Sequence, residues 1–158
     1  SLMLEYLYEG FDFSGSKIEN NPRSNQFYAM TNEWKQNPLF GAGHGASAKS
    51  SIRSEGTPWA YELSYVALLF HTGILGFLCY LAGVVWIFLK GFKIIKSGHW
   101  LSTYLPAILL GTLCFLIANA TNPYLEKFDY MWVIFLPVAA INIWLLERNQ
   151  LRKSLINK

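Results

Sequence analysis

The sequence predicts an all-α membrane protein with about three transmembrane helices and a polar N-terminal region outside the lipid. Charged residues, Gly, Asn and Ser occur throughout residues 1–60, whereas residues 63–146 carry few charges, confined to two short stretches. The apolar runs are longer than the about 18 residues that indicate a membrane crossing. Aromatic residues make up 16% of the chain, and Trp and Tyr often stand near the ends of those runs, as at membrane interfaces.

Composition also limits the functional classes. The net charge is +3 and the basic residues are dispersed, so no nucleic-acid-binding stripe is predicted. Cys79 and Cys114 lie inside apolar runs and are interpreted as small hydrophobic residues, so neither a metal site nor a cofactor is expected. The chain begins Ser1-Leu2-Met3 without a signal-peptide pattern. We therefore expect a fragment of a larger helical bundle.

The outer region, residues 1–61, is expected to hold one short amphipathic helix. Residues 2–8 are interpreted as the end of a preceding membrane helix. Asn21-Pro22 predicts a helix start over 22–36, with Asn as the cap and Pro in the first turn. Apolar residues then follow at helical spacing, namely Phe27, Met30 and Trp34. Asn37-Pro38 ends this helix before a flexible glycine-rich loop at residues 41–45.

Three spans are expected within residues 62–146, at about 63–89, 104–121 and 130–146. Asn122-Pro123 ends the second span and opens a short loop. Glycines in the first span share one helical face and predict close packing against another helix. They are Gly73, Gly76 and Gly83.

Basic residues fix the expected orientation. The loop between the first two spans is purely basic, with Lys90, Lys93 and Lys96. The tail, residues 147–158, is also basic, with Arg148, Arg152, Lys153 and Lys158 against Glu147. The positive-inside rule places both segments in the cytoplasm. Residues 1–61 and the loop at 122–129 then face the other side.

Polar residues on that outer side are candidates for function. Glu62 stands at the mouth of the first span, either as a functional carboxylate or as a cap on the first helical turn, and we weigh the two equally. Arg23 is either a phosphate clamp, since its guanidinium fork matches phosphate oxygens, or a solvated helix residue. His71 lies about 13 Å below Glu62 if the helix is continuous. It is interpreted as a neutral imidazole bonded to a neighbouring helix in preference to a functional group.

The order of these motifs resembles a known family. Arg23 opens a helix, residues 38–45 read Pro-Leu-Phe-Gly-Ala-Gly-His-Gly, and Glu62 precedes Tyr65, which is followed eight residues later by Gly73-Ile-Leu-Gly. This set resembles the C-terminal half of the bacterial O-antigen polymerase and O-antigen ligase superfamily over about residues 14–146. Members have many more spans than three.

The resemblance implies a metal-independent glycan transfer from an undecaprenyl-pyrophosphate donor at the periplasmic face of the bacterial inner membrane. Arg23 would neutralise the leaving pyrophosphate and Glu62 would orient or deprotonate the acceptor hydroxyl. Substrate contacts would come from Tyr65 and from the loop residues Gly41, Gly43, His44 and Gly45. No motif includes Arg53, which is interpreted as a second phosphate contact.

Several alternatives stay open. Ligases of this superfamily usually carry His at the position of Glu62, which favours a polymerase over a ligase that transfers glycan to lipid A-core. Expected partners are the lipid-linked glycan, membrane lipid, and either a chain-length regulator or missing N-terminal helices. A transporter segment would use His71 and Glu62 along a polar path, although no broken helix is apparent in the sequence. A non-catalytic membrane anchor would require only the spans.

Overall fold

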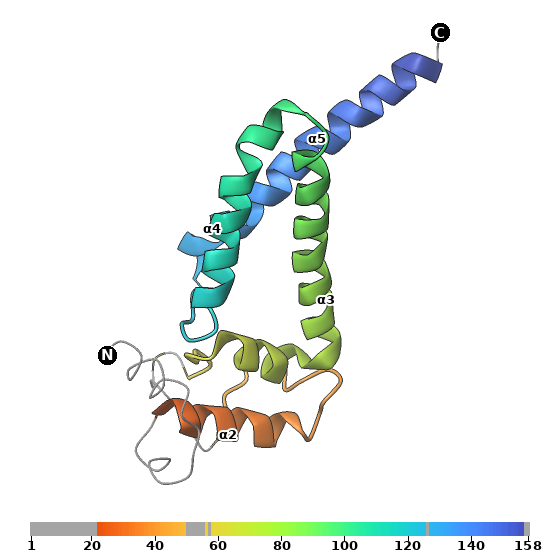
Figure 1. Cartoon of the computed structure of the whole chain (residues 1–158). Coiled ribbons are helices and arrows are strands. Elements are labelled where there is room, and N and C mark those ends of the chain that lie inside the picture. Colours follow the sequence, from red (N-terminus) through yellow and green to blue (C-terminus); the bar gives the residue numbers. More distant parts are fainter. Residues whose placement is uncertain (1–21, 50–55, 57, 126, 157–158) are drawn as a thin grey trace, which may run out of the picture.

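The computed structural model describes residues 22–49, 56, 58–125 and 127–156, and all regular structure among them is helical. The expected all-α class is therefore confirmed for this part of the chain. The elements are α2 (Pro22–Trp34), α3 (Ser64–Ile95), the 3-10 helix η2 (Trp100–Thr103), α4 (Leu105–Ala118), the 3-10 helix η3 (Phe128–Tyr130) and α5 (Trp132–Ile156) (Figure 1). The predictions for residues 2–8, Asn21 and Arg53 fall outside the described residues.

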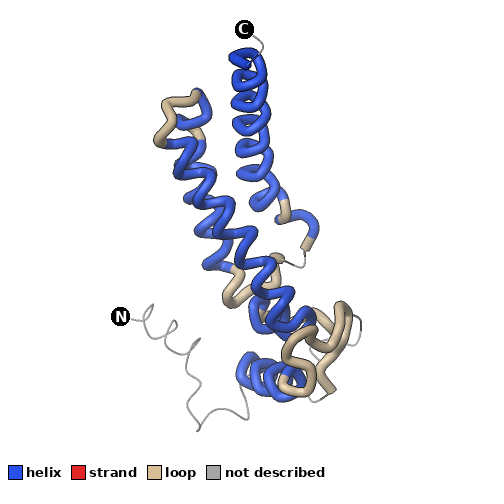
Figure 2. The backbone as a smooth tube through the Cα atoms, turned by 90° about the vertical axis from the view of Figure 1, so that its right-hand side faces the viewer, coloured by secondary structure: helices blue, strands red, loops and turns tan. Residues whose placement is uncertain are grey.

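The helices form two parts that meet inside α3. The longer part of α3 packs with α4 and α5 in a three-helix bundle, and α2 lies across one end of that bundle beneath the first turns of α3 (Figures 1 and 2). The bundle core is apolar because each helix turns a few large side chains inward. Its buried members are Ile87, Ile94, Leu101, Leu105, Leu109, Ala140, Ile141 and Trp144.

Helix α3 is broken at Gly73. This residue has φ 65° and ψ −172°, a backbone region that is essentially restricted to glycine. Residues 64–72 run beside α2, and residues 74–95 turn along the bundle (Figure 1). The expected continuous span at 63–89 is therefore wrong. The part after the break has 22 residues and a length of about 33 Å, close to the thickness of a bilayer core.

The expected glycine packing face is also wrong. Gly73 is the break itself, and a Cβ on Gly83 would meet nothing within 4 Å. The close approach between α3 and α4 occurs instead at Gly91, where a Cβ would lie 2.6 Å from a methyl group of Leu109.

Helix α4 is shorter than the expected span at 104–121. It has 14 residues, or about 21 Å, because the Asn119 side chain turns the chain. The Asn119 amide donates to the Phe115 carbonyl at 3.0 Å and its oxygen accepts from the Leu125 amide at 2.9 Å. Helix α5, in contrast, continues past the expected end at residue 146 and includes most of the tail.

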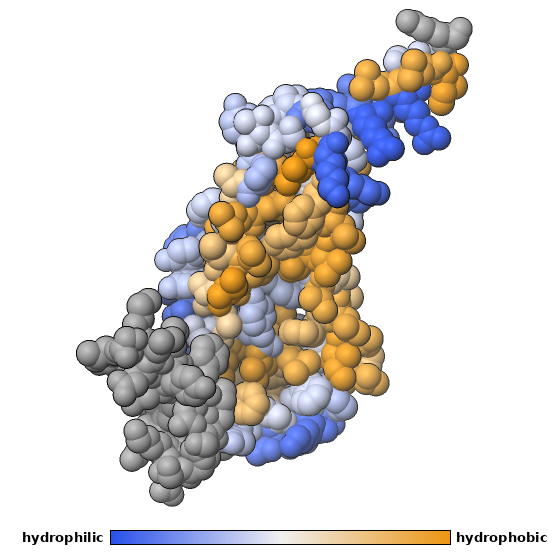
Figure 3. All heavy atoms as spheres, viewed as in Figure 1, coloured by the Kyte–Doolittle hydropathy of each residue, from blue (hydrophilic) through white to orange (hydrophobic). Residues whose placement is uncertain are grey.

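Two segments are long and apolar enough to cross a membrane, namely Ser64–Ile95 and Phe128–Ile156. Only 11% and 22% of their most apolar stretches are buried within the protein, unlike the core helices of soluble proteins. Apolar side chains instead cover the outside of the bundle (Figure 3). Length, composition and this exposed apolar surface indicate a membrane protein.

The two basic segments lie at the same end of the bundle, as the sequence predicts. His99, in the turn after α3, contacts the Glu147 carboxylate of α5 through Nε2 at 2.7 Å. His99 Nδ1 accepts from the Leu101 amide, so Nε2 carries the proton that is donated to Glu147. The layer formed by α2 and residues 64–72 lies at the opposite end (Figure 1).

Candidate functional site

Arg23 and Glu62 form an ion pair at the end of the bundle where α2 lies. Arg23 Nε donates to Glu62 Oε2 at 2.8 Å, although the residues are 39 positions apart. The side chains are 36% and 25% exposed, so the contact is partly shielded from water. The sequence hypothesis requires these two groups to lie together, and the structure places them in direct contact.

Packing between α2 and residues 64–72 brings the pair together. An apolar cluster fills the interface, formed by Ala29, Met30, Ala48, Tyr61, Leu63, Ala67 and Phe70. Phe27 and Trp34 pack against it, so the expected apolar face of α2 is confirmed. Gln26 is buried on the same helix, and its side-chain oxygen accepts from the Glu62 backbone amide at 3.0 Å. Gln26 therefore fixes the backbone that carries the carboxylate.

Glu62 does not cap α3 by a hydrogen bond. Leu63 is the residue at the N-cap of α3, and no side chain caps this helix end by a hydrogen bond. The Glu62 carboxylate points to Arg23 instead. Sequence reasoning missed Gln26, because a polar residue on a short helix carries no signal that it will be buried.

The glycine-rich loop pairs with the break in α3 through four backbone hydrogen bonds. The amides of Ala42 and Gly43 donate to the carbonyls of Phe70 and His71 at 2.8 and 3.0 Å. In the other direction, two carbonyls accept from the amides that follow the break: Pro38 from Ile74 at 2.9 Å and Leu39 from Leu75 at 3.2 Å. We call this pairing of residues 38–43 with residues 70–75 the glycine clasp. It satisfies backbone groups that a helix end leaves without partners.

The glycines of the loop have different roles. Gly41, Gly43 and Gly45 all have positive φ. A Cβ on Gly41 would lie 2.5 Å from the Phe70 oxygen, whereas a Cβ on Gly43 or Gly45 would meet nothing within 4 Å. Gly41 thus belongs to the clasp. Gly43 and Gly45 flank the exposed His44, and this part of the loop is open to a ligand.

His71 lies before the break and is not inside a continuous span, so its expected depth of about 13 Å below Glu62 on a straight helix is wrong. It is 4% exposed, and Nε2 donates to the Ala46 carbonyl at 3.0 Å, because a carbonyl can only accept. Its ring also contacts His44 at a centroid distance of 5.7 Å. The interpretation that His71 bonds within the protein holds, but its partner is loop backbone and not a neighbouring helix.

Tyr65, expected to contact substrate, joins the outer layer to the bundle. Its hydroxyl donates to the Leu116 carbonyl of α4 at 2.5 Å. The neighbouring Ser64 hydroxyl donates to the Asn122 carbonyl at 2.7 Å. These bonds give Tyr65 a structural role between the two parts of the protein.

A small apolar hollow lies in the same layer as the ion pair. It has a volume of about 150 Å³ and lies between α2 and residues 64–72. Its lining residues are Phe27, Met30, Thr31, Trp34, Val66, Leu69 and Phe70. Phe27 follows Arg23 by one turn of α2, so the hollow begins near Arg23.

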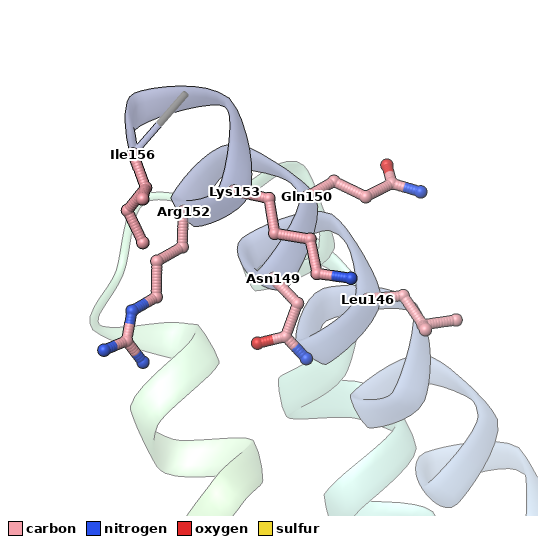
Figure 4. A pocket seen from close by; sticks show the side chains of 6 residues that line it. All are labelled: Leu146, Asn149, Gln150, Arg152, Lys153 and Ile156. Carbon is pink, nitrogen blue, oxygen red and sulfur yellow. The ribbon is translucent and has the colours of Figure 1, made fainter. Parts of the chain in front are cut away.

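A larger hollow of about 510 Å³ lies on the far part of α5 and is lined by Leu146, Asn149, Gln150, Arg152, Lys153 and Ile156. Figure 4 shows that these side chains all project from one helix. Within the described residues no second element forms an opposite wall, so this surface is not an enclosed binding pocket. The described residues also contain no group of three or more His, Cys, Asp or Glu that could hold a metal ion.

Comparison with protein-family models, with curated proteins and with solved structures gives no match for this chain.

Proposed function

We propose that this chain is the C-terminal portion of a membrane enzyme that polymerises undecaprenyl-pyrophosphate-linked oligosaccharide units, similar to O-antigen polymerases. The observation that carries the proposal is the 2.8 Å contact between Arg23 and Glu62. It joins the two residues to which the motif order assigns the chemistry. The open part of the glycine-rich loop lies in the same layer, across one end of an apolar bundle.

The proposed orientation follows from charge. Residues 74–95, α4 and α5 are the three spans, and the end that carries the lysines in the last turns of α3 and the basic part of α5 is cytoplasmic. The layer with Arg23 and Glu62 is then periplasmic, at the surface of the inner membrane. Because α4 is short, its flanking turns complete the crossing.

In the proposed reaction, an acceptor sugar hydroxyl attacks the anomeric carbon of the donor. A new carbon–oxygen bond forms, the bond to the pyrophosphate oxygen breaks, and undecaprenyl pyrophosphate leaves with the electron pair. Glu62 accepts the hydroxyl proton or orients the hydroxyl. Arg23, whose Nε contacts Glu62, stabilises the negative charge that develops on the leaving group, because a guanidinium stays charged and its planar N–H donors match phosphate oxygens.

The apolar hollow supports a lipid-linked donor. A prenyl chain needs apolar walls next to the group that binds its phosphate, and the hollow begins one helical turn from Arg23. A ligase would use the same arrangement with lipid A-core as acceptor. Partners are the lipid-linked glycan, membrane lipid, and a chain-length regulator or further helices of the same bundle.

A transporter is the second candidate, because broken helices are typical of transporter sites. At such sites the broken ends face a substrate. Here the amides of Ile74 and Leu75 and the carbonyls of Phe70 and His71 are paired with the glycine-rich loop. This pairing favours the polymerase over the transporter.

The test uses Arg23→Ala and Glu62→Gln in the intact protein that contains this chain, with glycan chain length measured on gels. Both variants are expected to lose the polymer ladder, and at least a hundredfold of the activity, because a positioned charge is removed from the transition state. Lys35→Ala and Asp129→Asn are matched controls, since each removes an exposed charge of the same sign. Normal ladders in both site variants would refute the polymerase. Loss of solute uptake in His71→Ala, with full uptake in Arg23→Ala, would instead support the transporter.

A further inference from the structure

We infer that Gly41 and Gly73 are positioning residues for the Arg23–Glu62 pair, acting through the glycine clasp. The inference rests on the proposed function only for its effect on activity. The placement of the pair is tested separately below.

The backbone angles at Gly73 require glycine. Its φ of 65° and ψ of −172° lie in a region that residues with a Cβ do not adopt without backbone strain. A residue other than glycine favours helical angles here, and the flanking residues on both sides are already helical. The sequence around the break would then form one continuous helix.

The space between the glycine-rich loop and the break in α3 is too small for a Cβ. A Cβ on Gly73 would lie 2.3 Å from the Leu39 oxygen, and a Cβ on Gly41 would lie 2.6 Å from the Gly73 amide nitrogen. Both contacts are with backbone, which cannot rotate away as a side chain can. Each glycine therefore allows the four hydrogen bonds of the clasp, and neither tolerates even a methyl group.

Residues 64–72 connect the clasp to the ion pair. Glu62 lies directly before residues 64–72, so the direction of this half-helix sets the position of its carboxylate. In the structure the half-helix lies beside α2, where Arg23 stands (Figure 1). If α3 were straight, residues 64–72 would extend about 13 Å further along the bundle axis. Glu62 would then move away from α2.

The apolar cluster holds the half-helix against α2, but neither it nor the bonds to α4 set the angle between the half-helix and the rest of α3. Tyr65 and Ser64 bind α4 and the turn after it, and both lie near the start of the half-helix. The clasp holds its other end, at Phe70 and His71. Both ends are needed to keep it across the bundle.

The experiment measures the distance between α2 and the second part of α3. Spin labels are placed at Asn25 and Leu78, which are exposed, in a chain whose exposed cysteines Cys79 and Cys114 are changed to Ser. The label distance is measured in lipid nanodiscs for the chain with unchanged glycines and for Gly73→Ala and Gly41→Ala.

Gly83→Ala is the matched control, because it adds the same methyl group to α3 in open space. The control is expected to keep the original distance distribution. Both clasp variants are expected to shift or broaden it. An unchanged distribution in Gly73→Ala and Gly41→Ala overturns the inference. If one variant does not fold, the other decides the result.

Activity provides a second, separate readout in the intact protein. Displacement of a catalytic group by about 1 Å can lower the rate about a hundredfold. Each clasp variant is therefore expected to lose about as much polymer as Glu62→Gln. Gly73→Ala combined with Glu62→Gln is expected to lose no more than either alone. Additive losses would show that Gly73 acts independently of Glu62 and would overturn the inference. Full activity of Glu62→Gln itself would refute the proposed function, while the label distances still decide the role of the clasp in placement.

Discussion

The Arg23–Glu62 contact can be measured as a coupling energy, independently of any enzymatic activity. The perturbation is a double-mutant cycle with Arg23→Ala, Glu62→Ala and the double variant. The two groups are joined by a 2.8 Å charge-assisted hydrogen bond. Gln26 binds the Glu62 backbone and remains in place in every variant, so the cycle isolates the side-chain contact.

The expected magnitude follows from distance and exposure. Solvent-exposed ion pairs contribute about 0.2–1 kcal/mol, because water screens them and the side chains lose entropy. Residues in direct contact within one network couple by about 0.5–3 kcal/mol. The Arg23 and Glu62 side chains are 36% and 25% exposed, so this pair lies between a fully exposed ion pair and a contact within a buried network. We expect a coupling of about 1 kcal/mol, or about a fivefold change in the unfolding equilibrium.

The assay is reversible unfolding in detergent micelles, monitored by tryptophan fluorescence, at low and high salt. The coupling should decrease at about 1 M salt, where the screening length falls to about 3 Å. A cycle of Lys35→Ala with Glu62→Ala is the control, because Lys35 follows the opposite end of α2, and its coupling should be close to zero. An Arg23–Glu62 coupling as small as that of the control would refute the contact on which the proposed site depends.

Two further predictions concern stability. Leu105→Ala should destabilise the bundle by about 2–5 kcal/mol, since it leaves a cavity in the core. Leu110→Ala, at a side chain that is 62% exposed on the same helix, should cost less than about 0.5 kcal/mol in the same unfolding assay, and equal losses would contradict the described core. Tyr61→Phe should cost about 1–3 kcal/mol, because it removes the hydroxyl that accepts from the buried Ala48 amide at 2.5 Å. A Tyr61→Phe chain as stable as the original would argue against that bond.

The helices could be predicted from apolar runs and local signals, but their interruptions could not. Pro22 and the spacing of Phe27, Met30 and Trp34 were sufficient for α2, since both signals act within a few residues. The break at Gly73 depends on hydrogen bonds between residues 28 to 36 positions apart. The spacing of the glycines alone is equally compatible with close helix packing. The local signal for the break is the loop itself, where Pro-Leu and three alternating glycines allow the backbone to approach another segment closely.

The site was predictable in part. Arg23 and Glu62 were selected from the order of motifs, and their proximity was a requirement that spacing could not establish. Glu62 alone is compatible with a helix cap, and only packing between two helices shows which group it contacts. His71 was placed too deep, because depth along a helix is meaningful only when the helix is continuous. The role of Tyr65 between the two parts was missed, because an interfacial tyrosine carries no signal for its partner.

The clasp has one consequence for how this layer can vary during evolution. Its four hydrogen bonds run from main chain to main chain, so they do not depend on the side chains of the residues that make them. Phe40, Ala42 and His44 are exposed on this supported loop. They can therefore be exchanged while the scaffold beneath them keeps its shape.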